Sequence, residues 1–121
     1  MPVVPGLSIV VAGTDPARLN AALSVAAAWA ALERRARIFL QAEAVGLLRK
    51  LDEADDSGAS AGQPSLRDLL AESLALGVSV TACQSGLALA GLTADRLPDG
   101  IDTGGLVGFL AERGDDQLMM A

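Results

Sequence analysis

The sequence predicts an α/β fold in which helices cover the faces of a mostly parallel sheet. Apolar runs of strand length alternate with helical patterns along the chain, which is the order typical of such a sheet. The 121 residues can bury one core without disulfides or metal. The segment after residue 64 is too short for a second core, so we expect residues 1–121 to form a single domain.

The first half of the chain predicts two strands and two helices. Residues 7–12 form the first strand. The Gly-Thr-Asp-Pro motif at residues 13–16 then supplies a turn, a capping side chain and a proline at the first helical position, so a helix is expected over residues 16–34. This helix is apolar nearly all round, which predicts a second packing surface and therefore a homo-oligomer. Residues 37–41 read as a buried strand and residues 43–51 as a short helix.

The middle of the chain interrupts this alternation. Residues 52–64 are acidic and then rich in Ser, Gly and Ala, a composition that predicts a mobile surface loop. Ser65 is a plausible N-cap for a leucine-rich helix that stops at Gly77. The next two expected elements are a strand over residues 78–82 and a helix over residues 84–91.

The last thirty or so residues contain shorter elements. One helical turn is expected over residues 93–97, a tight turn over residues 98–100 and an extended piece around Ile101. A helix that ends at Gly114 then leads into a last strand over residues 117–120. The sheet therefore has four strands, or five if the piece around Ile101 joins it.

Charge and hydropathy exclude two classes of partner. The net charge of -6 and the pI near 4.4 argue against nucleic acid, which requires a basic surface. The dense basic group of Arg34, Arg35 and Arg37 falls at the carboxyl end of a predicted helix, where cations offset the helix dipole and solvate the turn.

The longest apolar stretch, residues 25–32, is far shorter than the roughly 18 residues of a membrane span. A lone cysteine and the lack of a leader predict a cytoplasmic protein.

The residue types that the chain lacks exclude many classes of enzyme. The chain has no histidine, no tyrosine and one cysteine, so it cannot form a Ser-His-Asp or Cys-His nucleophile pair, a histidine-containing zinc site or a thiolate cluster. It also has no glycine-rich dinucleotide motif and no Walker-type phosphate loop. We therefore predict neither a cofactor nor a metal.

Cys83 is the candidate reactive residue. It lies between a predicted strand and a predicted helix, at the edge of an open α/β sheet where reactive groups gather. The N–H groups and the dipole at a helix N-terminus favour thiolate over thiol. Backbone N–H groups of Gln84, Ser85 and Gly86, and the Gln84 or Ser85 side chain, would stabilise the thiolate, while Gly86 would allow close approach to the sulfur.

Known thiol loops do not fit this segment. A CxxC redox motif requires cysteine at the position of Gly86, and a phosphatase-type loop requires arginine at the position of Leu89. A rhodanese-type loop usually has basic or hydroxyl groups that this loop places differently. The remaining hypothesis is that the Cys83 thiolate accepts a group from another protein's thiol and releases it again. The simplest such group is sulfane sulfur, held on the cysteine as a persulfide.

Residues 74–83, which end in Cys83, are followed by Gly91-Leu92-Thr93 and Gly104-Gly105-Leu106, and the first helix is rich in alanine. In these segments the sequence resembles the DsrE/DsrF-like family of small sulfur-relay proteins. The resemblance implies a three-layer α/β/α sandwich and assembly into trimers or hexamers. In cysteine-bearing members it also implies persulfide carriage at the position of Cys83, with sulfur donor and acceptor proteins as partners. The activity implied is that of a sulfurtransferase.

Other residues are weaker candidates, and the role of Cys83 has an alternative. Gly13, Thr14 and Asp15 come after the first strand and Glu43 comes after the second, so all should share the sheet edge with Cys83. A structural role accounts for these residues more simply. Thr14 and Asp15 would cap the helix that follows them, and Glu43 would be an acidic residue in the first turn of a helix, where it offsets the helix dipole. Free cysteine is also often a small core hydrophobe. The alternative function is therefore a non-catalytic oligomeric subunit or small-ligand binder.

Overall fold

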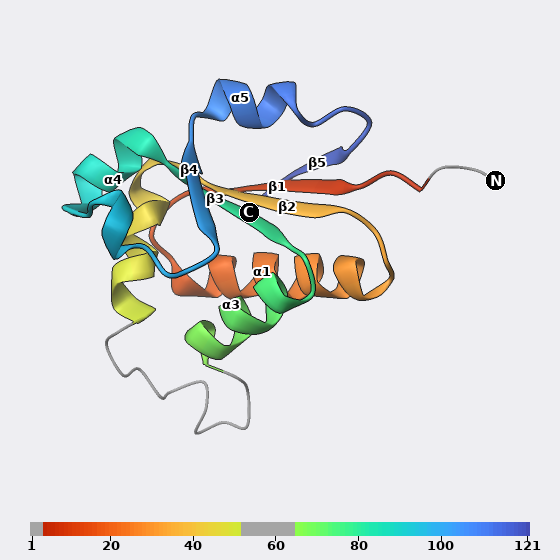
Figure 1. Cartoon of the computed structure of the whole chain (residues 1–121), viewed down its shortest axis with the longest axis horizontal. Helices are drawn as coiled ribbons and strands as arrows, with labels where there is room; N and C mark the ends of the chain where they lie inside the picture. Colours follow the sequence, from red (N-terminus) through yellow and green to blue (C-terminus); the bar gives the residue numbers. More distant parts are fainter. Residues whose placement is uncertain (1–3, 52–64) are drawn as a thin grey trace.

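In the computed structural model, which describes residues 4–51 and 65–121, five parallel strands form one sheet in the order β4-β3-β2-β1-β5 (Figure 1). The strands are β1 (Leu7–Val11), β2 (Ala36–Leu40), β3 (Ser79–Cys83), β4 (Ile101–Gly104) and β5 (Gln117–Met120). The predicted α/β class is confirmed, and the extended piece around Ile101 is a full strand at one edge of the sheet. The loop expected over residues 52–64 lies outside the described residues.

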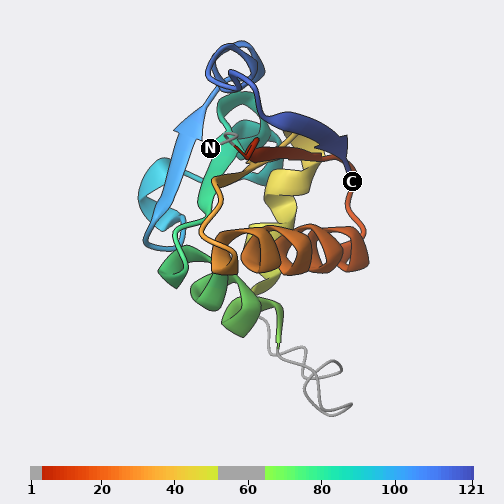
Figure 2. The ribbon, with the colours of Figure 1, turned by 90° about the vertical axis from the view of Figure 1, so that its right-hand side faces the viewer.

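Helices lie on both faces of the sheet and at one end of it. The α-helices α1 (Pro16–Ala31) and α3 (Leu66–Ala75) cover one face, and α5 (Leu106–Ala111) lies over the other (Figures 1 and 2). The helix α4 (Gln84–Ala90) and the 3-10 helix η1 (Ala42–Leu51) lie together at the carboxyl ends of the strands. A second 3-10 helix, η2 (Ala94–Arg96), precedes β4. This arrangement gives the three layers that were predicted.

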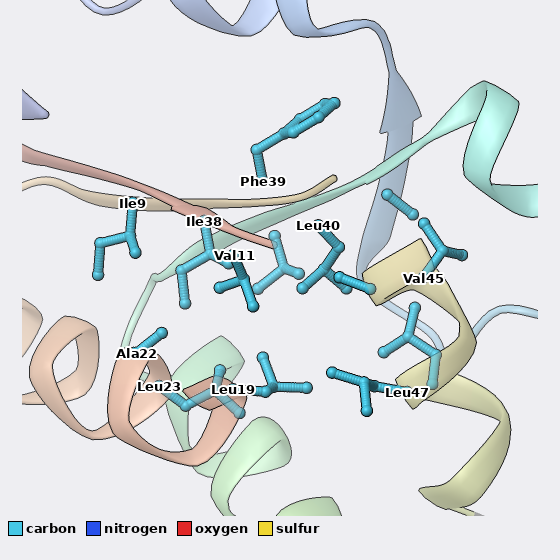
Figure 3. Close-up of a cluster of buried hydrophobic side chains, with 14 of the residues drawn as sticks. Ile9, Val11, Leu19, Ala22, Leu23, Ile38, Phe39, Leu40, Val45 and Leu47 are labelled. Carbon is cyan, nitrogen blue, oxygen red and sulfur yellow. The ribbon is translucent and has the colours of Figure 1, made fainter. Parts of the chain in front are cut away.

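The core fills the space between the sheet and helices α1 and α3. Alternate side chains of the central strands point toward α1, among them Ile9, Ile38 and Leu40 (Figure 3). They meet Leu19 and Leu23 of α1, and all five side chains are at most 2% exposed. Burial of one such side chain contributes roughly 1.5–3 kcal/mol. This core fixes the sheet from which the carboxyl-end loops extend.

Helix α1 begins as predicted and ends earlier than predicted. Asp15 is its N-cap, and the side chain accepts a hydrogen bond from the Ala17 N–H at 3.0 Å. The helix ends at Ala31 rather than at residue 34, because Glu33 adopts a left-handed conformation with φ 63°. The chain can then turn directly into β2, which a longer helix would delay.

The opposite face of the sheet contains a buried ionic network. Arg37 of β2 is 6% exposed and Asp116 is 5% exposed. The Arg37 Nε lies 3.4 Å from Asp116 Oδ2, and Ser8 Oγ of β1 donates to the same oxygen at 2.9 Å. Arg37 Nη2 also donates to the Phe109 carbonyl at 2.9 Å, which ties α5 to the sheet. The prediction that Arg37 belongs to a solvated basic turn is therefore wrong, because a side chain in the middle of a parallel sheet lies beneath the covering helix.

The element after β2 is a 3-10 helix and begins one residue earlier than predicted. Its buried residues fall into two rows of three-residue spacing, Ala44 and Leu47 in one and Val45, Leu48 and Leu51 in the other. This spacing suits the three residues per turn of a 3-10 helix. The same residues also fit the apolar face of an amphipathic α-helix, so the sequence pattern did not distinguish a 3-10 helix from an α-helix. In the 3-10 form, residues three apart are aligned in rows.

Candidate functional site

Cys83 lies where β3 ends and α4 begins. It is the last residue of the strand and the N-cap position of the helix, and it is paired across the sheet with Gly104 of β4. The Sγ atom lies 3.1 Å from the Ser85 hydroxyl oxygen. The residue is 7% exposed, so its thiol sits at the margin of the core.

Hydrogen bonding lowers the pKa of the Cys83 thiol below that of an ordinary cysteine. Burial alone would raise the pKa, because it disfavours the charged thiolate. The Ser85 hydroxyl and the backbone N–H groups of Ala42, Gly86 and Ser85 stabilise the thiolate and outweigh burial. The thiol is therefore set up to ionise more readily than a free one.

Ala42 contributes to this site although alanine is not a residue type that indicates a functional role. It comes directly after Gln41 at the end of β2, and its φ of 46° places a non-glycine residue in the left-handed region, which costs roughly 1 kcal/mol. This turn brings the Ala42 N–H to the sulfur. Its one sequence signal is its position at the carboxyl end of the strand next to β3, because alanine itself has no reactive group.

The side chains of Gln84 and Ser85 differ in their placement. Both residues are exposed, but it is the Ser85 hydroxyl that forms a hydrogen bond with the sulfur. Among the described residues, Gln84 makes no comparable contact with the thiol. Of the two side chains proposed from the sequence, Ser85 is the one that lies against the sulfur.

Gly86 is required for the packing of α4 against η1, and its backbone N–H also reaches the Cys83 sulfur. A Cβ at this position would collide with the Ala42 carbonyl oxygen and would lie 2.6 Å from Val45 Cγ2. The missing side chain lets α4 rest directly on the backbone of η1. This contact holds Ala42 and the start of α4 together around Cys83.

Replacing Gly86 with alanine is expected to destabilise the fold by about 2 kcal/mol, because backbone atoms cannot move away as a flexible side chain would. The measurement is urea denaturation of the wild type and the variant. Gly108→Ala in α5 is the matched control, since a Cβ there meets nothing within 4 Å and alanine favours helix. Equal stability of Gly86→Ala and the wild type would contradict this packing role.

Gly13 and Thr14 lie in the loop after β1, and Glu43 is in the first turn of η1, which follows β2. Gly13 has φ 81° and forms the turn after β1. Thr14 and Glu43 line a cavity of about 430 Å³ between η1 and α4. Cys83 is not among the residues that line this cavity, so the immediate partners of the thiol are the Ser85 hydroxyl and the neighbouring backbone N–H groups.

Two further features of the described residues bear on the site. Over residues 4–51 and 65–121, no three side chains of the Asp, Glu, Cys or His type come together in a way that could hold a metal ion. Within the same ranges, none of the helices has the length and hydropathy needed to span a membrane.

Fold and site together define an α/β protein with one thiol at the carboxyl edge of a parallel sheet. The chain belongs to the DsrE/DsrF-like family, whose model matches residues 7–113, and this confirms the resemblance seen in the sequence. The crystal structure of the ychN protein from E. coli is similar, with a TM-score of 0.65 and 19% identity over 97% of this chain and 98% of that one. At this identity the likeness shows a shared fold. A search of curated proteins found no match.

Proposed function

We propose that the protein carries sulfane sulfur as a persulfide on Cys83 and passes it to a thiol of a partner protein, as a sulfurtransferase does. The observation that supports this most directly is the set of donors around the Cys83 sulfur, with the Ser85 Oγ at 3.1 Å and three backbone N–H groups. A purely structural thiol does not need groups that favour its ionised form. Membership of the DsrE/DsrF-like family agrees with this chemistry.

The transfer is a thiol exchange that needs no oxidant. The Cys83 thiolate attacks the terminal sulfur of a donor persulfide, a new S–S bond forms at Cys83, and the donor's S–S bond breaks to release a donor thiolate. The terminal sulfur keeps its proton. An acceptor thiolate then attacks that sulfur in the same way and regenerates the Cys83 thiolate.

The test of this proposal is intact mass spectrometry of the reduced protein after incubation with a sulfane-sulfur donor such as inorganic polysulfide. We expect a gain of one sulfur atom that a thiol reductant reverses. A protein that gains no sulfur, and whose thiol is labelled only after unfolding, would contradict the proposal.

Replacing Ser85 with alanine is expected to raise the pKa of the Cys83 thiol, because the variant lacks the hydroxyl that favours the thiolate. At a pH below both pKa values, iodoacetamide should alkylate the variant more slowly than the wild type. At a pH above both, the variant should react at least as fast, since thiolate nucleophilicity increases with pKa. The pH profile of alkylation measures this, and Ser85→Thr, which keeps the hydroxyl, is the control. Superimposable profiles for Ser85→Ala and the wild type would contradict the assignment.

A second candidate function is a non-catalytic subunit in which Cys83 is a core residue. The observation that favours it is the 7% exposure of Cys83, which packs within the hydrophobic cluster. The rate of thiol labelling in the native protein separates the two functions. Labelling at the rate of global unfolding supports the second, and labelling far faster supports the first.

The sulfur-carrier proposal includes an assembly of identical subunits, a trimer or a hexamer, in a reducing compartment such as the cytoplasm. Exposed apolar side chains on α5 and β5 support self-association: Val107 is 84% exposed, Leu118 46% and Met120 65%. The face of the sheet beneath α5 has a single covering helix among the described elements (Figure 2). Light scattering coupled to gel filtration gives the subunit number, and a monomer at micromolar concentration would contradict the assembly.

A further inference from the structure

We infer that the cavity between η1 and α4 is a binding site for a small zwitterionic ligand of dipeptide size, with a cationic amine at one end and a carboxylate at the other. The cavity has a volume of about 430 Å³. Its lining consists of Thr14, Glu43, Gly46, Leu47, Arg49, Leu89 and Ala90. This site is separate from the thiol, and the inference does not rest on persulfide chemistry.

The 3-10 winding of η1 aligns the polar groups of this cavity. Glu43, Gly46 and Arg49 are three residues apart, so in a 3-10 helix they form one row along the same face. All three line the cavity. Gly46 in the middle has no side chain, and a Cβ there would meet nothing within 4 Å. Along this row, the Glu43 carboxylate and the Arg49 guanidinium therefore lie on either side of an open space at Gly46.

Arg49 is held in place by α4. Its Nη1 donates to the Ala90 carbonyl at 3.0 Å, at the end of the helix, where Gly91 adopts the left-handed capping conformation. This bond uses one of the five N–H donors of the guanidinium. The group is positioned at the cavity wall, with further donors for a carboxylate, a pairing that guanidinium geometry suits.

The ligand class is set by charge and length. Glu43 would receive an amine and Arg49 a carboxylate, and the two charges of the row cancel, as those of a zwitterion do. Six residues of 3-10 helix span about 12 Å at about 2 Å per residue. A dipeptide separates its charges by one residue more than an amino acid does, roughly 3.5 Å further, and so covers more of this row than an amino acid does. Leu47, which is buried, and Leu89, which is 68% exposed, offer an apolar wall for its side chain.

Titration of the ¹⁵N-labelled full chain with glycyl-L-leucine, monitored by NMR, tests this inference. We expect chemical-shift changes centred on the amides of residues 46–49 and 89–90. N-acetyl-glycyl-L-leucine lacks the amine and glycyl-L-leucinamide lacks the carboxylate, and each should bind at least about tenfold more weakly, because a charge-assisted contact is lost. Equal binding of all three compounds, no binding, or shifts elsewhere on the protein would overturn the inference.

Two variants test the cavity itself. Gly46→Leu fills the hollow and should abolish binding, whereas Gly108→Leu, at an equally open glycine on α5, should leave it unchanged. Glu43→Gln keeps the shape of the side chain and removes its charge. It should therefore weaken the binding of glycyl-L-leucine by about tenfold and leave the binding of the N-acetylated compound unchanged. Cys83→Ser should bind like the wild type. Undiminished binding by Glu43→Gln would overturn the inference, whether or not Gly46→Leu folds.

Discussion

Replacing Cys83 with serine is expected to abolish sulfur uptake completely while leaving the fold intact. The chain has one cysteine, and a serine hydroxyl is neither ionised at neutral pH nor able to hold a sulfane sulfur as a thiolate does. The smaller oxygen fits the same space and can keep a hydrogen bond with Ser85, 3.1 Å from the sulfur in the wild type. Intact mass after incubation with inorganic polysulfide measures the uptake, and thermal denaturation measures the fold.

The chain offers a matched control because its single thiol can be moved. Ser79→Cys in the Cys83→Ser background places one exposed thiol at the other end of β3, away from Ser85 and the Ala42 N–H. This relocated thiol should take up sulfur more slowly at neutral pH, since it lacks the donors that favour the thiolate. Uptake by Cys83→Ser itself, or equally fast uptake by the relocated thiol, would be evidence against a role for this site in sulfur transfer.

Removing the carboxylate of Asp116 is expected to produce the largest loss of stability, about 3 kcal/mol for Asp116→Ala. Arg37 and Asp116 are 6% and 5% exposed, and the carboxylate also accepts the Ser8 hydroxyl at 2.9 Å. Alanine would leave the Arg37 guanidinium in the core without its buried counter-charge. An uncompensated charge costs far more than the intact pair contributes.

Urea denaturation of Asp116→Ala and of the neighbouring variant Asp115→Ala measures this effect. Asp115 is exposed, so its replacement removes the same charge with little expected change in the free energy of unfolding. Because Arg37 also binds the Phe109 carbonyl, Asp116→Ala should loosen α5 first, and amide hydrogen exchange in α5 should accelerate. Equal stability of the two variants would show that solvent reaches Arg37 and that the network contributes little.

The elements and their order could be predicted from the sequence because each depends on local chemistry. Asp15 and Pro16 start a helix wherever they come after a strand and a turn. The apolar runs at residues 7–12 and 37–41 have the length and composition of buried strands in any parallel sheet. The place of Cys83 between strand and helix could be read from the same local patterns, and so could its candidacy as the reactive group.

The surroundings of the thiol depend on contacts between distant segments. Ala42 lies 41 positions before Cys83 and has no reactive side chain, so only the pairing of β2 with β3 brings its N–H to the sulfur. Gly86 was predicted to allow close approach to the sulfur, and only the fold shows that its missing side chain also makes room for the Ala42 carbonyl across the helix contact. Residue type alone does not reveal what will lie opposite a glycine.

The α/β class, the family and the one cysteine available as a nucleophile could be predicted from the amino-acid sequence, because these depend on periodicity, motif order and composition. The fold was needed to show that the Arg37 side chain is buried, that η1 winds as a 3-10 helix, and that Glu43, Gly46 and Arg49 form one row beside α4. Solvation and alignment depend on the neighbours that a side chain has in space. Those neighbours come from segments that the fold, and not the chain order, brings together.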